Sequence, residues 1–218
     1  SAEELLNAPA VSPEAASVCA APATDEHRVG APLAEYFRDS TRQRMREALI
    51  SVRTRLGRSH PLLIGADELE TTETLTVRNP AIPTEIVGRV AEASAADVDR
   101  AVQVAADGQP RWAATPVGER VAALRRAAGL MRGCRDELTA LEVIEVGKPW
   151  READADVVEA IEYLEYYSEQ MLGLSQGRPL VQVLGERNAY TYVPRGIAAV
   201  IAPWNFPVAI LTGMASAA

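Results

Sequence analysis

The 218-residue sequence predicts an α/β fold, and two features of its apolar pattern carry this prediction. Between residues 94 and 171, apolar residues recur at helical spacing in three or four consecutive segments. After residue 179 the pattern changes, and residues 197–201 (IAAVI) form a continuous apolar run. Such a run is typical of a strand in a parallel sheet that is covered on both faces. Helices that lead into a buried parallel strand indicate the α/β class.

Composition excludes several classes of function. A hydrophobic content of 48% with 24% charged residues fits a globular protein with a core, and the net charge of −8 argues against non-specific binding to nucleic acid or anionic membranes. The arginines between residues 42 and 58 spread around a predicted helix, which favours a solvated surface over a phosphate-binding patch. No apolar run approaches the roughly 18 residues that a membrane span needs, and no signal peptide is apparent, so we expect a cytoplasmic protein.

The N-terminal third is predicted to hold an arm, a helix and short strands. Residues 1–32 are rich in Ala, Pro and Ser without a sustained period, which indicates a linker or extended arm. A helical pattern follows over residues 33–56. Residues 62–64 and 74–77 are predicted to form a short hairpin around a turn at 65–68, with another strand near residues 85–90.

The helical region shows start and stop signals as well as stripes. Ser94 and Asp97 resemble a capping box at the start of a helix that we expect to end at Gly108. A later helix, over about 135–146, is followed by Gly147-Lys148-Pro149, which terminates it. The next helix starts among three acids that suit the positive end of its dipole: Glu152, Asp154 and Asp156. Three of the helices carry apolar stripes that we expect to be buried: Val98, Val102 and Ala105 in the first; Val121, Leu124, Ala128 and Met131 in the second; Val157, Ile161, Leu164, Ser168 and Met171 in the fourth.

The C-terminal segment is predicted to return to strands. Residues 180–184 and 190–193 look like two strands around a turn at 185–188. The buried strand at 197–201 then leads to a loop, and a helix begins near Val208. Because α/β proteins place ligands at the carboxyl ends of their strands, we expect a binding site in this loop.

The loop itself contains groups suited to acyl chemistry. Pro203 and Pro207 restrict its backbone, and Trp204 and Phe206 can wall an apolar cleft. Asn205 lies between them and supplies an uncharged amide that can donate to a developing oxyanion. The residues alone leave a second interpretation open, in which Asn205 caps the following helix.

Longer motifs resemble a known family. The stretch YVPRGIAAVIAPWNFP (residues 192–207) is similar to the first nucleotide-binding strand and loop of the aldehyde dehydrogenase superfamily. The runs EVGKPW (145–150), EADADV (152–157), YYSEQM (166–171) and GERN (185–188) resemble the subfamily of L-glutamate-γ-semialdehyde dehydrogenases, also called 1-pyrroline-5-carboxylate dehydrogenases, of proline catabolism. The resemblance extends loosely back to about Leu33.

This resemblance implies an aldehyde-dehydrogenase-like α/β fold, of which the chain holds the N-terminal part of a Rossmann-type NAD-binding domain and a β-flap used for homo-oligomerisation. The implied parts are a linker or arm (1–32), an N-terminal helical segment (33–60), the first part of the NAD-binding domain (61–179 and 195–218) and part of the flap (180–194). The catalytic domain would lie outside the chain.

The resemblance also implies roles for individual residues. Asn205 would donate to the oxyanion, and Glu152 would approach the amino acid head group of the substrate, although an acid that merely stabilises the start of a helix fits Glu152 equally well. Phe206 would line the aldehyde tunnel. The nicotinamide end of the NAD cleft would be lined by backbone at Ile201, Ala202, Pro203 and Trp204.

Two catalytic groups of the family are missing from the chain. The family uses a nucleophilic cysteine and a glutamate general base, both well downstream of the Asn-Phe-Pro loop. Neither Cys19 nor Cys134 sits in a motif that resembles the nucleophile's. We therefore expect these 218 residues alone to be inactive, and to belong either to a separate dehydrogenase or to a bifunctional proline-utilisation flavoenzyme whose upstream domain would bind FAD. An enzyme for another aldehyde, or a non-catalytic assembly module, are the alternatives.

Overall fold

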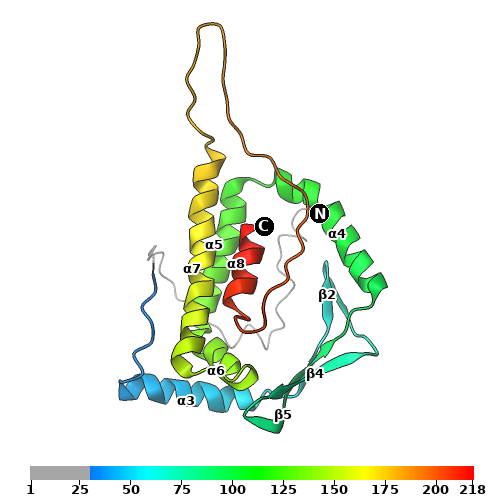
Figure 1. Cartoon of the computed structure of the whole chain (residues 1–218), viewed down its shortest axis with the longest axis vertical. Helices are drawn as coiled ribbons and strands as arrows, with labels where there is room; N and C mark the ends of the chain where they lie inside the picture. Colours follow the sequence, from blue (N-terminus) through cyan, green and yellow to red (C-terminus); the bar gives the residue numbers. More distant parts are fainter. Residues whose placement is uncertain (1–29) are drawn as a thin grey trace.

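The computed structural model describes residues 30–218 as a group of helices beside a small, strongly curved sheet (Figure 1). Helices α5, α7 and α8 lie side by side, α6 packs under α7, and α3 packs against α6 at the base of the group. Helix α4 lies apart from them and packs on a strand of the sheet region. The bounds are α3 Asp39–Arg53, α4 Ala95–Ala114, α5 Val117–Gly133, α6 Arg135–Glu145, α7 Trp150–Ser175 and α8 Ala209–Ala217.

The strands form a three-stranded mixed sheet and a separate hairpin. In the sheet, β5 (Ile82–Ala91) pairs in parallel with β1 (Arg58–His60) and antiparallel with β4 (Thr74–Asn79). The hairpin joins β2 (Leu62–Ile64) to β3 (Asp67–Leu69).

Two sequence predictions about these strands are wrong. Strand β2 does not pair with residues 74–77, because the chain turns back at once through Gly65, whose φ of +65° suits a residue without a side chain, and residues 67–69 form its partner instead. Residues 58–60 lie after the predicted helix, at the end of the segment (33–60) that is expected to be helical, but they form strand β1. It forms because the long strand β5 offers a second edge to residues 58–60.

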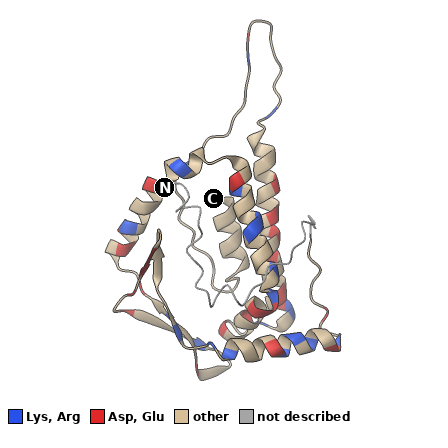
Figure 2. Cartoon of the chain, turned by 180° about the vertical axis from the view of Figure 1, so that it is seen from behind, with Lys and Arg blue, Asp and Glu red and all other residues tan. Residues whose placement is uncertain are grey.

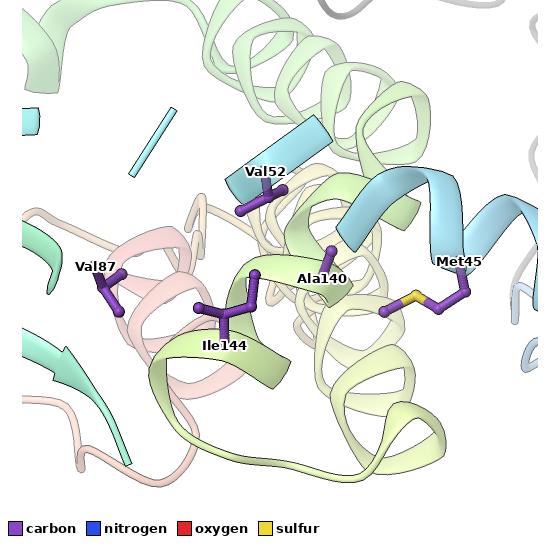
Figure 3. Packing of buried hydrophobic residues seen from close by; sticks show 5 residues of the cluster. All are labelled: Met45, Val52, Val87, Ala140 and Ile144. Atoms are coloured by element: carbon purple, nitrogen blue, oxygen red, sulfur yellow. The ribbon is translucent and has the colours of Figure 1, made fainter. Parts of the chain in front are cut away.

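Two clusters of buried side chains hold the helices together and confirm most of the predicted stripes. The first brings Met45 and Val52 of α3 and Val87 of β5 against Ala140 and Ile144 of α6 (Figure 3). The second lies between α5 and α7. It consists of Ala128, Val157, Ile161 and Leu164, with Leu124, Met131 and Leu138 packed around it.

Helix α4 differs from its prediction. Its capping box is present, with the Asp97 backbone N–H donating to Ser94 Oγ. However, the helix continues past Gly108 to Ala114, and Val98 and Val102 are exposed. The side of α4 that approaches the β2–β3 turn is instead the side of Val104, because a Cβ on Gly65 would lie 3.2 Å from its side chain.

The segment between α7 and α8 holds no regular strand. Residues 180–194 run out beyond the end of the helices as a long protruding loop (Figure 1). An isolated bridge between Arg178 and Tyr190 closes its base, and hydrogen bonds between Gln182 and Asn188 join its two sides. Residues 197–201 are also without strand pairing, and Ile201 is 84% exposed. The prediction of a buried strand is therefore wrong for this chain. A parallel strand needs neighbouring strands to accept its backbone hydrogen bonds, and no strand of residues 30–218 lies next to it.

Charged residues of both signs are mixed along α3, whereas those of α7 are almost all acidic (Figure 2). Arginines of α3 and of the turn after it pair with acids of α6, as in Arg44 with Asp136 at 3.3 Å and Arg55 with Glu137 at 2.7 Å. This pairing is the behaviour expected of a solvated, salt-bridged surface. Among residues 30–218, no helix is both long and apolar enough to cross a membrane.

The packing of α8 on α7 makes a specific prediction for Gly213. A Cβ at this position would lie 2.8 Å from Tyr163 Cδ2, so Gly213→Ala should overpack the interface and lower the free energy of unfolding by about 1 kcal/mol after its gain in helix propensity. Gly129→Ala in α5 is the control, because nothing lies within 4 Å of its Cβ position, and it should stabilise by about 0.5–1 kcal/mol. Urea unfolding of both variants measures the two effects, and a stabilised Gly213→Ala would refute the close packing.

Candidate active-site loop

The loop of residues 201–207 joins the extended segment to α8, and most of its side chains face outward. Trp204 is 80% exposed, and Pro203, Asn205 and Phe206 are exposed as well, while Ala202 is half-buried. Within the described residues, the side chain of Asn205 makes no hydrogen bond. Its amide is therefore available to a ligand.

The end of the loop is fixed to α7 through Asp156. Its Oδ2 accepts hydrogen bonds from the backbone N–H groups of Val208 at 3.2 Å and Ala209 at 3.4 Å, which are the N-cap and the first residue of α8. The helix has no capping side chain of its own. Asp156 thus does the work that the alternative interpretation gave to Asn205.

A buried lysine continues this attachment. Lys148 Nζ lies 3.4 Å from Asp156 Oδ1 and 3.1 Å from Glu142 Oε2, and its side chain is only 13% exposed. The face of the Phe206 ring covers the same ammonium, with 4.6 Å between Nζ and the ring centroid. A cation over an aromatic face is attractive, and more so when it is shielded from water. The ammonium of Lys148 is therefore in contact with α6 through Glu142, with α7 through Asp156 and with the loop through Phe206.

The carboxyl group of Glu142 has an unusually high pKa in this cluster. The pKa of Glu142 is raised from 4.5 to about 8, first by burial, then by the hydrogen bond and negative charge of Asp156, with Lys148 acting in the opposite direction. Two carboxyls that share one lysine in a dry environment favour retention of a proton.

The three acids in the first two turns of α7 differ in burial: Asp154 and Asp156 are buried, and Glu152 is exposed. Asp154 is buried and forms a bidentate pair with Arg135, at 2.7 and 2.8 Å, and it also accepts the backbone N–H of Ala34. The prediction that Asp154 and Asp156 serve the start of their own helix is wrong, because α7 begins at Trp150 and both face its packed side. Glu152 alone lies exposed in the first turn.

The structure thus unites some predicted site residues and leaves others apart. The Phe206 ring lies over Lys148, which directly precedes α7, and Asn205 is its neighbour in the loop, while Glu152 lies in the first turn of α7. No ion pair or hydrogen bond in the described part of the chain engages Glu152. Cys134 lies at the junction of α5 and α6, outside this loop, and Cys19 lies outside the described residues.

Sequence reasoning missed Glu142, Lys148 and Asp156 as a unit. A signal was present for Asp156, which stands three residues after Ala153 and four before Ala160, so it shares the buried face of the helix. No local pattern shows that Glu142 on the preceding helix faces the same point.

Comparison with known proteins defines the class. Residues 68–218 match the aldehyde dehydrogenase family, and the chain belongs to this family. The α/β fold with its mixed sheet agrees with that assignment.

Particular relatives narrow the comparison. The chain is 42% identical over 182 residues to a 1-pyrroline-5-carboxylate dehydrogenase of a Geobacillus species, covering 84% of this chain and 35% of that protein. A solved structure of the Thermus enzyme of that name with bound NAD superimposes with a TM-score of 0.84 at 41% identity, over 89% of this chain and 38% of the other. The proline utilization A protein of Bdellovibrio bacteriovorus gives 0.81 at 34% identity, over 89% of this chain and 20% of the other. The chain therefore spans little more than a third of the dehydrogenases that it matches.

The raised pKa of Glu142 predicts a pH-dependent stability. Between its ordinary pKa of 4.5 and its folded pKa of about 8, the folded protein keeps a proton that the unfolded chain releases. The free energy of unfolding contributed by this proton is complete below about pH 4.5 and is lost as the pH rises through about 8. Glu142→Gln removes this dependence.

Urea unfolding from about pH 5 to about pH 9 should show the wild type losing stability relative to Glu142→Gln. Glu162→Gln, an exposed change on α7, is the control and should leave the pH profile of the wild type unaltered. Parallel profiles for wild type and Glu142→Gln would contradict the assignment.

Proposed function

We propose that the chain is the N-terminal portion of an NAD-dependent dehydrogenase that oxidises L-glutamate γ-semialdehyde, formed from 1-pyrroline-5-carboxylate, to L-glutamate in proline catabolism. The observation that carries the proposal is an exposed Asn205, whose amide makes no hydrogen bond within the described residues, in a loop attached to Lys148 and Asp156. The chain that holds this loop is 42% identical over 182 residues to a protein of that name. The nucleophilic cysteine and the general-base glutamate would come from the remainder of the protein.

The residues present fit the role of a cofactor wall and an oxyanion donor. The backbone of residues 201–203 has no sheet pairing and Trp204 begins a turn, so polar groups of this backbone can face the nicotinamide end of a bound NAD. NAD, when bound, accepts the hydride from the thiol adduct of the aldehyde. Asn205 would donate its amide to the oxygen of that adduct, and Phe206 would form one wall of the aldehyde channel.

Glu152 is proposed to select the substrate. As an exposed carboxylate without a partner in the described residues, it can pair with the ammonium of an amino acid aldehyde. Its place in the first turn of α7 equally favours a purely structural role, which would leave an aldehyde dehydrogenase for another substrate as the second candidate.

The remaining parts of the chain have proposed roles in assembly and organisation. Residues 180–194 protrude and expose Val181, Leu184 and Val193, which supports a flap that docks on another copy of the protein. We propose residues 61–179 and 195–218 as the first part of the NAD-binding domain, with residues 33–60 as an N-terminal helical segment. An arm at residues 1–32 falls almost entirely outside the described residues. FAD would be bound only by an upstream proline dehydrogenase domain.

The oxyanion role predicts a large loss of turnover for Asn205→Ala. In the full-length protein, this change should lower kcat with 1-pyrroline-5-carboxylate about 10²–10³-fold, because one donor to a developing oxyanion contributes about 2.7–4 kcal/mol. Asn205→Asp keeps the shape without the donor and should lose at least as much. The absorbance of the NADH formed measures the rate, and thermal unfolding verifies the fold. Unchanged turnover would defeat the assignment.

The substrate role of Glu152 predicts a selective effect. Glu152→Ala should lower kcat/KM for glutamate semialdehyde about 10-fold or more, as expected for a lost charge-assisted pair, and should leave a simple aliphatic aldehyde almost unaffected. Glu162→Ala, an exposed change further along α7, is the matched control. Equal effects on both aldehydes would reduce Glu152 to a helix-terminal acid.

A further inference from the structure

We propose that Glu142, Lys148, Asp156 and the ring of Phe206 form a latch that positions the side chain of Asn205, with Asp156 and Lys148 as positioning residues. The inference rests on the proposed function, since it concerns the same loop. It adds residues on α6, on α7 and in the connection between them that would not touch substrate and would act through the loop.

Asp156 joins two parts of the latch with one carboxylate. Its Oδ1 faces Lys148 Nζ at 3.4 Å, and its Oδ2 accepts the amides of Val208 and Ala209. The residue is 1% exposed, so its Oδ2 depends on these amides for hydrogen bonds, and its Oδ1 has only the ion-pair contact with Lys148. A buried carboxylate that loses such partners is strongly destabilised, which makes a displaced loop costly.

Lys148 holds the other side of the loop. Its ammonium lies between Glu142 and Asp156, and the Phe206 ring closes over it. Phe206 is thus fixed by its ring, while Val208 and Ala209 are fixed by their amides. Asn205 is the first residue beyond these attachments, so its backbone begins from a defined position although its side chain is free.

Such placement matters for an oxyanion donor. The donor must lie within about 2.7–3.1 Å of the developing charge, and an error of about 1 Å can cost about 10²-fold in rate. The latch also sets the loop against the helix that carries Glu152, four residues after Lys148. One rigid group would therefore fix both the oxygen end and the head-group end of the substrate site.

Amide hydrogen exchange tests the latch without using activity. In the full-length protein, Asp156→Ala should speed exchange at Val208 and Ala209 by about 10-fold or more, since hydrogen bonds to a charged acceptor contribute about 1.5–3 kcal/mol. Asp156→Asn keeps an acceptor oxygen and should retain most of the protection. Arg132→Met, which breaks the α5–α7 pair with Glu165, is the control and should leave these amides unchanged. Equal protection in wild type and Asp156→Ala would overturn the latch.

A double-mutant cycle tests its effect on Asn205. Asp156→Ala should lower kcat about 10–100-fold with KM for NAD unchanged, but should have less than about a 3-fold effect when Asn205 is already alanine. Independent, multiplicative losses would mean a merely structural role and would overturn the inference.

Lys148→Met gives the same cycle by removing the ammonium while keeping most of the unbranched apolar stem, and it decides the question if Asp156→Ala does not fold. Non-additive losses with Asn205→Ala support the latch, and multiplicative losses overturn it. If Asn205→Ala alone leaves turnover intact, the proposed oxyanion role fails, and the exchange result at Val208 and Ala209 still decides whether the latch exists.

Discussion

Two buried carboxylates on α7 require partners, and the arrangement of the other elements follows from how they are satisfied. Asp154 and Asp156 are each 1% exposed, and an unpaired charge at that depth costs several kcal/mol. Asp154 takes the guanidinium of Arg135 and the amide of Ala34, which ties α6 and the start of the described chain to α7. Asp156 takes Lys148 and the first amides of α8. Helix α7 is thus the element to which the others attach.

The helical part and the C-terminal part of the chain differ in how far their apolar side chains are buried. Helices α3, α5, α6 and α7 bury their apolar residues against one another and against β5. The stretch from residue 180 to 206 instead exposes large apolar side chains along most of its length. The chain spans little more than a third of its relatives, and a parallel strand gains its hydrogen bonds only from neighbours in the sheet. Ile197 and Ile201 accordingly have the composition of a strand interior without its environment.

The same contrast explains what could be predicted from sequence. The stripes of α5 and α7 were recovered because a helix satisfies its own backbone, so local spacing is sufficient to indicate it. The predicted partner of β2 was wrong, because the local pattern could not show that the chain turns tightly at Gly65. Residues 67–69, which were assigned in part to the turn, therefore form the partner strand. The loop residues Asn205 and Phe206 were found through a family motif, whereas Glu142 escaped notice because its partners stand six and fourteen positions away on other turns.

The composition of the latch argues that geometry, rather than stability, is what it supplies. Replacing a buried ion cluster by apolar residues of similar volume is often neutral or stabilising, so a lysine and two carboxyl groups buried under a loop are a poor means of gaining free energy. The raised pKa of Glu142 indicates that negative charge on both Glu142 and Asp156 is unfavourable in this buried site. Hydrogen bonds are directional, however, and an apolar contact is not. A loop that must present one amide at a fixed point gains from directional attachments, which Asp156 provides at Val208 and Ala209, while the Lys148 ammonium under the Phe206 ring attracts the loop on the other side of Pro207.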